Sequence, residues 1–84
     1  MNWRTKALME TLAAARSMRL GLEAQASDHI VGVVDAFVEA PDAITASLNG
    51  IFGSISRAQG RRDYLRVADL LEFELRPALD KLTV

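Results

Sequence analysis

Two neighbouring carboxylates near the C-terminal end are the first residues whose spacing could support chemistry. Asp69 and Glu72 stand three residues apart, and on a helix this spacing places both side chains on one face. Such a pair can coordinate a divalent cation or act in acid–base catalysis. Either use needs further groups from other elements, whereas Arg66 and Arg76 lie at helical spacing from the two carboxylates. We therefore expect solvated ion pairs here.

His29 is the only histidine, and the chain has no cysteine. A histidine in the first turn of a helix, without a second metal ligand or a serine nucleophile nearby, gives no sign of catalysis. We expect no catalytic residue, no cofactor-binding residue and no metal ligand. The sequence therefore predicts a protein that is not an enzyme.

The arginines around Gly60 form the one candidate site for an anion. Residues 57–67 carry four basic groups and one acidic group, whereas residues 27–56 carry four acidic groups and no lysine or arginine. The cluster consists of Arg57, Arg61, Arg62 and Arg66. It could bind phosphate or an acidic protein surface, or it could pair with carboxylates of the same chain. Because only Tyr64 is interleaved for base stacking and the net charge is -1, we favour internal pairing and expect no nucleic-acid partner.

Length and composition indicate one small domain, residues 1–84. Half of the residues are hydrophobic and a quarter are charged, which is typical of a globular protein. A chain of this size buries only a little over 60% of the surface that its unfolded form exposes. Without disulfides or a structural metal, stability must come from helix packing or from association. We expect a homo-oligomer, with a dimer favoured.

The N-terminal residues predict no targeting segment. Charged residues up to Lys6 are not followed by the apolar run of a secretory signal. No apolar stretch approaches the roughly 20 residues that span a bilayer. We expect a cytoplasmic protein with no membrane partner.

Residues 3–26 predict a long helix, because they are strong helix formers with no proline. Ser27 followed by Asp28 predicts a helix start, and hence a boundary near residue 27. The expected apolar stripe of the first helix consists of Leu8, Leu12, Ala15, Met18 and Leu22.

The middle of the chain allows two interpretations. Residues 28–39 have a helical apolar spacing but are rich in β-branched side chains, so a strand is the alternative. Pro41 predicts a break, and residues 42–56 again favour a helix. Asn49 followed by Gly50 would instead suit a hairpin turn between short strands.

The last third predicts a second long helix. Gly60 suits a C-terminal cap, Asp63 suits the next N-cap, and the helix is expected to begin at Tyr64. Pro77 predicts a kink, because it cannot donate its backbone nitrogen. The expected stripe consists of Ala68, Leu71, Leu75, Leu79 and Leu82. Together the stripes predict an all-α, up-down bundle of three to four helices, with long N-terminal and C-terminal helices.

Four residues are candidates for contact with a partner. Leu70 and Phe73 lie beside the main stripe of the final helix, and aromatic residues are enriched where interfaces concentrate energy. Trp3 and Tyr64 are the other two candidates. Burial of Phe73 against Trp3 within the same chain is the alternative, and the sequence does not separate the two.

The segment Asp63–Pro77 also resembles a signature, D-Y-x-x-x-A-D-x-L-E-[FY]-E-[LI]-x-P, of short uncharacterised bacterial helical proteins. The resemblance covers about residues 60–80. In length and helical content the chain is similar to small flagellar or secretion chaperones, a likeness of architecture without a shared motif. It implies a chaperone-like, adaptor or regulatory module that contacts proteins through amphipathic helices. Binding of nucleic acid or an anionic ligand by the arginines is the alternative function.

Overall fold

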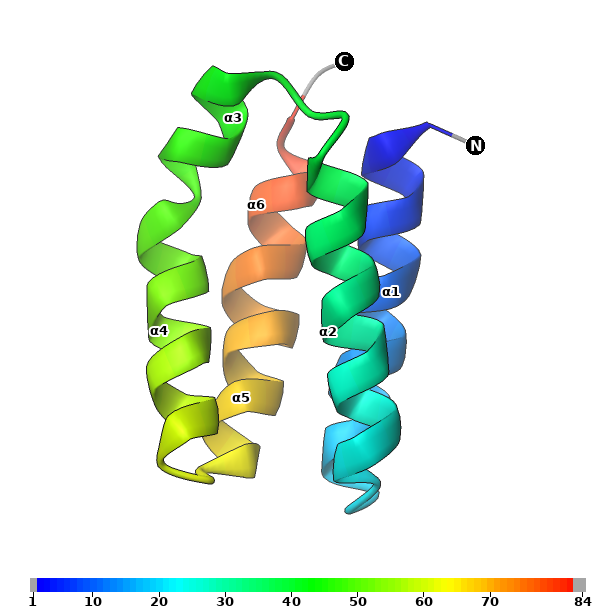
Figure 1. Ribbon diagram of the computed structural model, residues 1–84, viewed down its shortest axis with the longest axis vertical. Coiled ribbons are helices and arrows are strands. Elements are labelled where there is room, and N and C mark those ends of the chain that lie inside the picture. The colour runs from blue at the N-terminus through cyan, green and yellow to red at the C-terminus, as the bar shows by residue number, and fades with distance from the viewer. Residues whose placement is uncertain (1, 83–84) are drawn as a thin grey trace.

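The computed structural model describes residues 2–82, which form helices joined by short turns and contain no strand. The helices are α1 (Trp3–Arg19), α2 (Glu23–Phe37), α3 (Asp42–Ser47), α4 (Asn49–Gly60) and a C-terminal helix made of α5 (Tyr64–Leu70), η1 (Leu71–Leu75) and α6 (Arg76–Asp80). Successive long helices run in opposite directions (Figure 1). The predicted all-α, up-down bundle is therefore confirmed.

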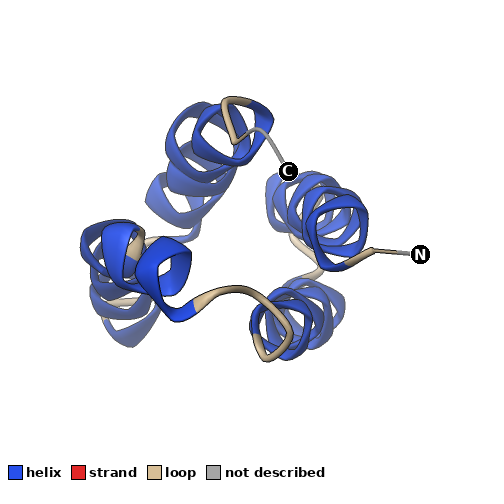
Figure 2. Cartoon of the chain, turned by 90° about the horizontal axis from the view of Figure 1, so that it is seen from above, coloured by secondary structure: helices blue, strands red, loops and turns tan. Residues whose placement is uncertain are grey.

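The helices do not all pack against one another equally. α1 packs along α2 and along the C-terminal helix, and α4 packs against the same C-terminal helix. α2 and the α3–α4 pair stand next to each other on one side of the bundle (Figure 2) but make few close contacts. That side of the bundle is the one on which the candidate site lies.

The first helix ends earlier than predicted. Asn2 caps its start, accepting a hydrogen bond from the Thr5 amide at 2.8 Å. At its end, Gly21 adopts a left-handed conformation with φ 75°, and its amide and that of Leu22 donate back to the carbonyls of Met18 and Ser17 at 3.1 and 2.9 Å. This pair of bonds is a Schellman motif, which stops a helix at a glycine. The boundary predicted near Ser27 was wrong, because Gly21 ends the helix first and Ser27 lies inside α2.

The middle segments are helical, as favoured, but residues 42–56 belong to two helices, α3 and α4, that meet at Leu48. α2 contains the β-branched run, because its apolar residues repeat with the helical period. Pro41 interrupts the helical structure immediately before α3, as predicted. The hairpin alternative was wrong, since Asn49 and Gly50 form the first turn of α4.

The turn between α4 and α5 contains a second Schellman motif, but its left-handed residue is Arg62. The amides of Arg62 and Asp63 donate to the carbonyls of Gln59 and Ala58 at 3.0 and 2.9 Å, and φ of Arg62 is 57°. The assignment of this role to Gly60 was therefore wrong, because Gly60 is still helical. Asp63 is the predicted N-cap of α5, accepting from the Arg66 amide at 3.3 Å.

The irregularity predicted at Pro77 is a π-helical turn, η1, directly before the proline. The amide of Arg76 donates to the carbonyl of Leu71, five residues earlier. A proline ring clashes with the carbonyl four residues before it, here that of Phe73. A wider turn at this point lets the helix continue into α6 without that contact.

The core lies where the faces of α1, α2, α4 and the C-terminal helix meet. The predicted stripe of the final helix is confirmed: Ala68, Leu71, Leu75 and Leu79 are buried, and Leu82 is partly buried. The stripe predicted for α1 is confirmed in part: Ala15 and Met18 are buried and Leu8 packs against the core, but Leu12 and Leu22 are exposed. The interior face also contains the small residues Ala7, Thr11 and Ala14. Small side chains allow α1 to lie close to α2.

None of the described helices is both long enough and apolar enough to cross a membrane.

Candidate protein-interaction surface

The carboxylates of Asp69 and Glu72 are held by an arginine from another helix. Arg19, at the end of α1, lies 3.0 Å from the Asp69 carboxylate and 3.4 Å from that of Glu72. The expected pairing with Arg66 and Arg76 was wrong, because α1 brings Arg19 alongside the C-terminal helix. The hydrogen bond to Asp69 and the charge of Glu72 raise the pKa of Arg19, so it stays charged. These groups tie α1 to the C-terminal helix.

His29 also has a partner from a neighbouring helix. Its Nδ1 lies 2.8 Å from a carboxylate oxygen of Glu10 on α1. Across residues 2–82 no three histidines or carboxylates are grouped closely enough to hold a metal ion. The pair therefore links α1 and α2.

The four arginines of the candidate anion site come to one end of the molecule, around the turn from α4 to α5, and all are exposed. Arg57 donates to the hydroxyl of Ser54 at 3.2 Å. Within residues 2–82, none of the four lies within ion-pair distance of a carboxylate. The expected pairing of this cluster with acidic residues of the same chain is thus not formed.

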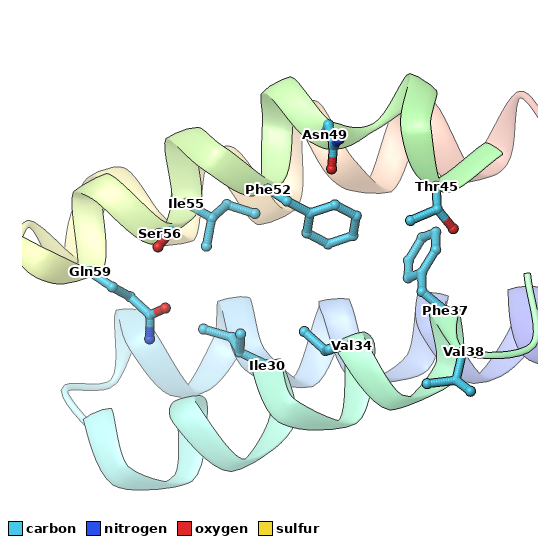
Figure 3. A pocket seen from close by; sticks show the side chains of 10 residues that line it. All are labelled: Ile30, Val34, Phe37, Val38, Thr45, Asn49, Phe52, Ile55, Ser56 and Gln59. Atoms are coloured by element: carbon cyan, nitrogen blue, oxygen red, sulfur yellow. The ribbon is translucent and has the colours of Figure 1, made fainter. Parts of the chain in front are cut away.

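An apolar groove with a volume of about 490 Å³ lies between α2 and α4 (Figure 3). Side chains from both helices point into it. Its lining, with Val38 at one end, consists of Ile30, Val34, Phe37, Val38, Thr45, Asn49, Phe52, Ile55, Ser56 and Gln59. Side chains of α2 and α4 face each other across the groove but do not interlock over its full length. The groove is therefore open to solvent on one side.

Two of the residues that line this groove are phenylalanines whose rings contact each other. The ring of Phe37 lies 5.3 Å from that of Trp3 and 5.0 Å from that of Phe52, centroid to centroid. Trp3 is 9% exposed and belongs to the core. Its proposed contact with a partner is corrected, because the indole is used inside the chain to pack against Phe37.

At the border of the groove, α2 presents a ridge of exposed valines, of which Val34 and Val38 also line the groove. Val31, Val34 and Val38 are 58%, 55% and 79% exposed. We call these three residues the valine ridge. Sequence reasoning assigned them to a helix but missed them as a site. The available signal was that the apolar residues of positions 30–38 cover more of the helix than one buried stripe requires.

The other predicted contact residues fall in different environments. Leu70 is 2% exposed and lies in the core, so its proposed role at an interface is corrected. Tyr64 is partly buried against the core. Phe73 is 63% exposed, with the Arg19 guanidinium 5.8 Å from its ring centre, so it does not pack against Trp3 as in the alternative. Of the four residues, Phe73 alone presents a large apolar surface to solvent.

Comparison with protein-family models, with curated proteins and with solved structures found no match. The likeness of residues 60–80 to short bacterial helical proteins stays a prediction.

Proposed function

We propose that this protein is a small, non-enzymatic protein–protein interaction module that binds another polypeptide through the α2–α4 groove and the valine ridge. The single observation that carries the proposal is that an open apolar groove and three exposed valines lie together on one side of the bundle. An apolar groove between two helices suits the apolar face of a third, as in helix-in-groove recognition. The module would act in the cytoplasm as an adaptor, regulator or chaperone-like protein.

The exposed valines support a bound polypeptide energetically. Covering a valine side chain contributes on the order of 1–2 kcal/mol through the hydrophobic effect. Val31, Val34 and Val38 contribute nothing comparable to the isolated chain, because more than half of each side chain is in water. They would stabilise a complex that covers them.

The shape of the groove favours a helix over a small molecule. Its volume of about 490 Å³ would suit either occupant. A small molecule within the groove would contact Val34 and Val38 but leave Val31 in water, because Val31 is not part of the lining. A helix laid along α2 and α4 would cover both.

Anion binding at the exposed arginines is the second candidate function. It is favoured by the absence of carboxylates within ion-pair distance of Arg57, Arg61, Arg62 and Arg66 in the described part of the chain. It predicts binding of a polyanion that falls steeply with salt and disappears when Arg61 and Arg62 are both replaced by serine. Binding that is undetectable, or insensitive to salt, would remove this candidate.

A photocrosslinking experiment tests the main proposal. A benzophenone amino acid is placed at Val34 or, as the control, at Leu65, an exposed residue of α5 that does not line the groove. Illumination of the two proteins in extract from cells that express the chain should give discrete protein adducts at position 34 and few at position 65. Equal labelling at both positions, or none at position 34, would contradict the proposal.

A further inference from the structure

We infer that the occupant of the α2–α4 groove is a second copy of this chain, in a two-fold symmetric dimer with α2 of each copy over α4 of the other. This inference rests on the proposed function, because it names the partner of the same surface. Three observations support it: the distribution of charge on the two helices, the surface shape of α4 and the size of the face.

The two helices that border the groove carry opposite charge. α2 contributes Glu23, Asp28 and Asp35 and no lysine or arginine, and Glu39 follows it. α4 contributes Arg57 and no carboxylate, and Arg61 and Arg62 follow it. A surface with one acidic and one basic border is complementary to a second copy of itself when the acidic border of each copy meets the basic border of the other.

This charge distribution selects one of two possible symmetric arrangements. A two-fold axis that lies in the interface and runs perpendicular to the helices would place α2 over α2 of the partner subunit, with carboxylates facing carboxylates. An axis parallel to the helices places α2 over the partner's α4, with carboxylates facing arginines. Since opposed like charges disfavour a complex, the second arrangement is preferred.

The level of the charged residues along the groove fits the second arrangement. Ile30 of α2 lies opposite Ile55 of α4 (Figure 3), and the two helices run in opposite directions. Asp28 and Arg57 each stand two residues beyond these positions, toward the same end of the groove. Rotation about an axis parallel to the helices keeps these levels, so Asp28 of one copy faces Arg57 of the other.

The surface of α4 offers room for the valine ridge. Gly53 lies in the interior of α4, where glycine costs about 1 kcal/mol relative to alanine. Within the chain, a Cβ at Gly53 would meet only the flexible end of the Arg57 side chain, at 3.3 Å. Neither the backbone angles nor the packing of the single chain therefore requires a glycine there. A helix of a second copy that lies close to α4 would use the space.

The face is large enough for a stable dimer. It is the broad side of the molecule, turned toward the viewer in Figure 1, and the bundle measures 33 × 24 × 19 Å. An interface of standard size buries about 800 Å² on each partner, so a stable dimer would have to cover most of this side. A pair that covered it would enclose the valine ridges and both grooves.

Molar mass in solution, measured by light scattering over a range of concentrations, tests the inference. The wild-type protein should approach twice the chain mass of 9.2 kDa. Val34→Lys should weaken the dimer by at least about a hundredfold, because it puts a charge at the centre of a desolvated apolar contact. The matched control, Leu65→Lys, makes the same change at an exposed aliphatic residue that does not line the groove and should leave the dimer intact.

A charge exchange tests the arrangement of the helices. Arg57→Glu should weaken the dimer by about tenfold, since the rim pair is formed twice. Asp28→Arg in the same chain as Arg57→Glu should recover most of this loss. Recovery is expected only if α2 lies over the partner's α4.

Two results with a monomer would overturn the inference: a wild-type monomer at all concentrations up to roughly 1 mM, or a monomer that carries a bound apolar small molecule. Two results with a dimer would also overturn it: a dimer insensitive to Val34→Lys, or a dimer dissociated by Phe73→Ser but not by Val34→Lys. A monomer that still gives protein adducts at position 34 would overturn the dimer and leave the proposed function standing. A monomer without adducts would overturn both.

Discussion

The ring of Phe37 on α2 meets the ring of Phe52 at the start of α4 edge to face, with 5.0 Å between centroids, and both rings line the α2–α4 groove. Phe37 also lies against Trp3 of α1. One side chain therefore joins three helices at the point where α2 and α4 come together.

Phe37→Leu should lower the free energy of unfolding by about 1–3 kcal/mol, because it removes two aromatic pairs worth about 0.5–1.5 kcal/mol each. Urea denaturation followed by circular dichroism measures this change. Phe73→Leu is the matched control, since Phe73 is exposed and its loss should cost less than about 0.5 kcal/mol. Equal effects of the two substitutions would contradict the role given to Phe37.

Arg62→Gly should raise the thermal midpoint. Arg62 has φ 57°, a left-handed conformation that costs a residue with a Cβ about 1 kcal/mol or more and costs glycine little. For a domain of this size, 1 kcal/mol corresponds to a shift of about 4–8 °C. Arg61→Gly removes the same charge at a position with φ -90° and should stabilise nothing. A gain from Arg61→Gly equal to that from Arg62→Gly would show that charge, rather than backbone conformation, is responsible.

Thr11→Val should also stabilise the fold. The hydroxyl of Thr11 is fully buried in α1 and has no hydrogen-bond partner among residues 2–82, a state that costs about 1–3 kcal/mol. Valine has nearly the same shape and removes the unpaired group, so calorimetry should show a higher midpoint. Thr5→Val, on the exposed side of the same helix, should have almost no effect. A loss of stability in Thr11→Val would mean that the hydroxyl has a partner in solution.

Gly53→Ala should act in opposite directions on the fold and on the dimer. Alanine at this helical position should add about 0.5–1 kcal/mol to the stability of the dilute, monomeric chain. The added methyl group should weaken self-association, because the two copies could no longer approach as closely at α4. Dilution series monitored by light scattering and by thermal melting separate the two effects. A variant that is stabilised and associates as tightly as the wild type would contradict close packing at Gly53.

The sequence predicted the fold well where the apolar period was long and unambiguous. Leu71, Leu75 and Leu79 line the core as expected, because the spacing of leucines in the final helix leaves one choice of buried face. In α1 the prediction was right for Ala15 and Met18 and wrong for Leu12 and Leu22. There Ala7, Ala14 and Thr11 are buried in preference to Leu12, because close approach to α2 favours small side chains over large ones. That preference depends on the neighbouring helix and is not visible in α1 alone.

Among the turns, too, the sequence predicted the features that depend on adjacent residues and missed others. Asp63 was correctly assigned as an N-cap, because its role depends on residues next to it in the chain. The left-handed residues that follow α1 and α4, Gly21 and Arg62, were missed. Gly21 lies inside the segment 3–26 that was predicted to be one helix, and an arginine gives no sequence signal of a left-handed conformation.

The candidate site was only partly predictable. Phe73 was expected at the surface or against Trp3, and it is exposed, whereas Trp3 and Leu70 are in the core. The groove needs two helices that are distant in sequence and incompletely packed, and no pattern within α2 or α4 describes that gap. The ion pairs of Arg19 with Asp69 and Glu72 were missed for the same reason, since they join residues from the two ends of the chain.

Thiol labelling at the groove tests the central claim most directly, because the chain has no cysteine of its own. Val34→Cys and the control Leu65→Cys each introduce one exposed thiol, and the rate of reaction with a maleimide is measured over a series of protein concentrations. We predict that labelling at position 34 slows as the concentration rises, while labelling at position 65 does not change. Equal, concentration-independent rates at both positions would contradict self-association through the α2–α4 face.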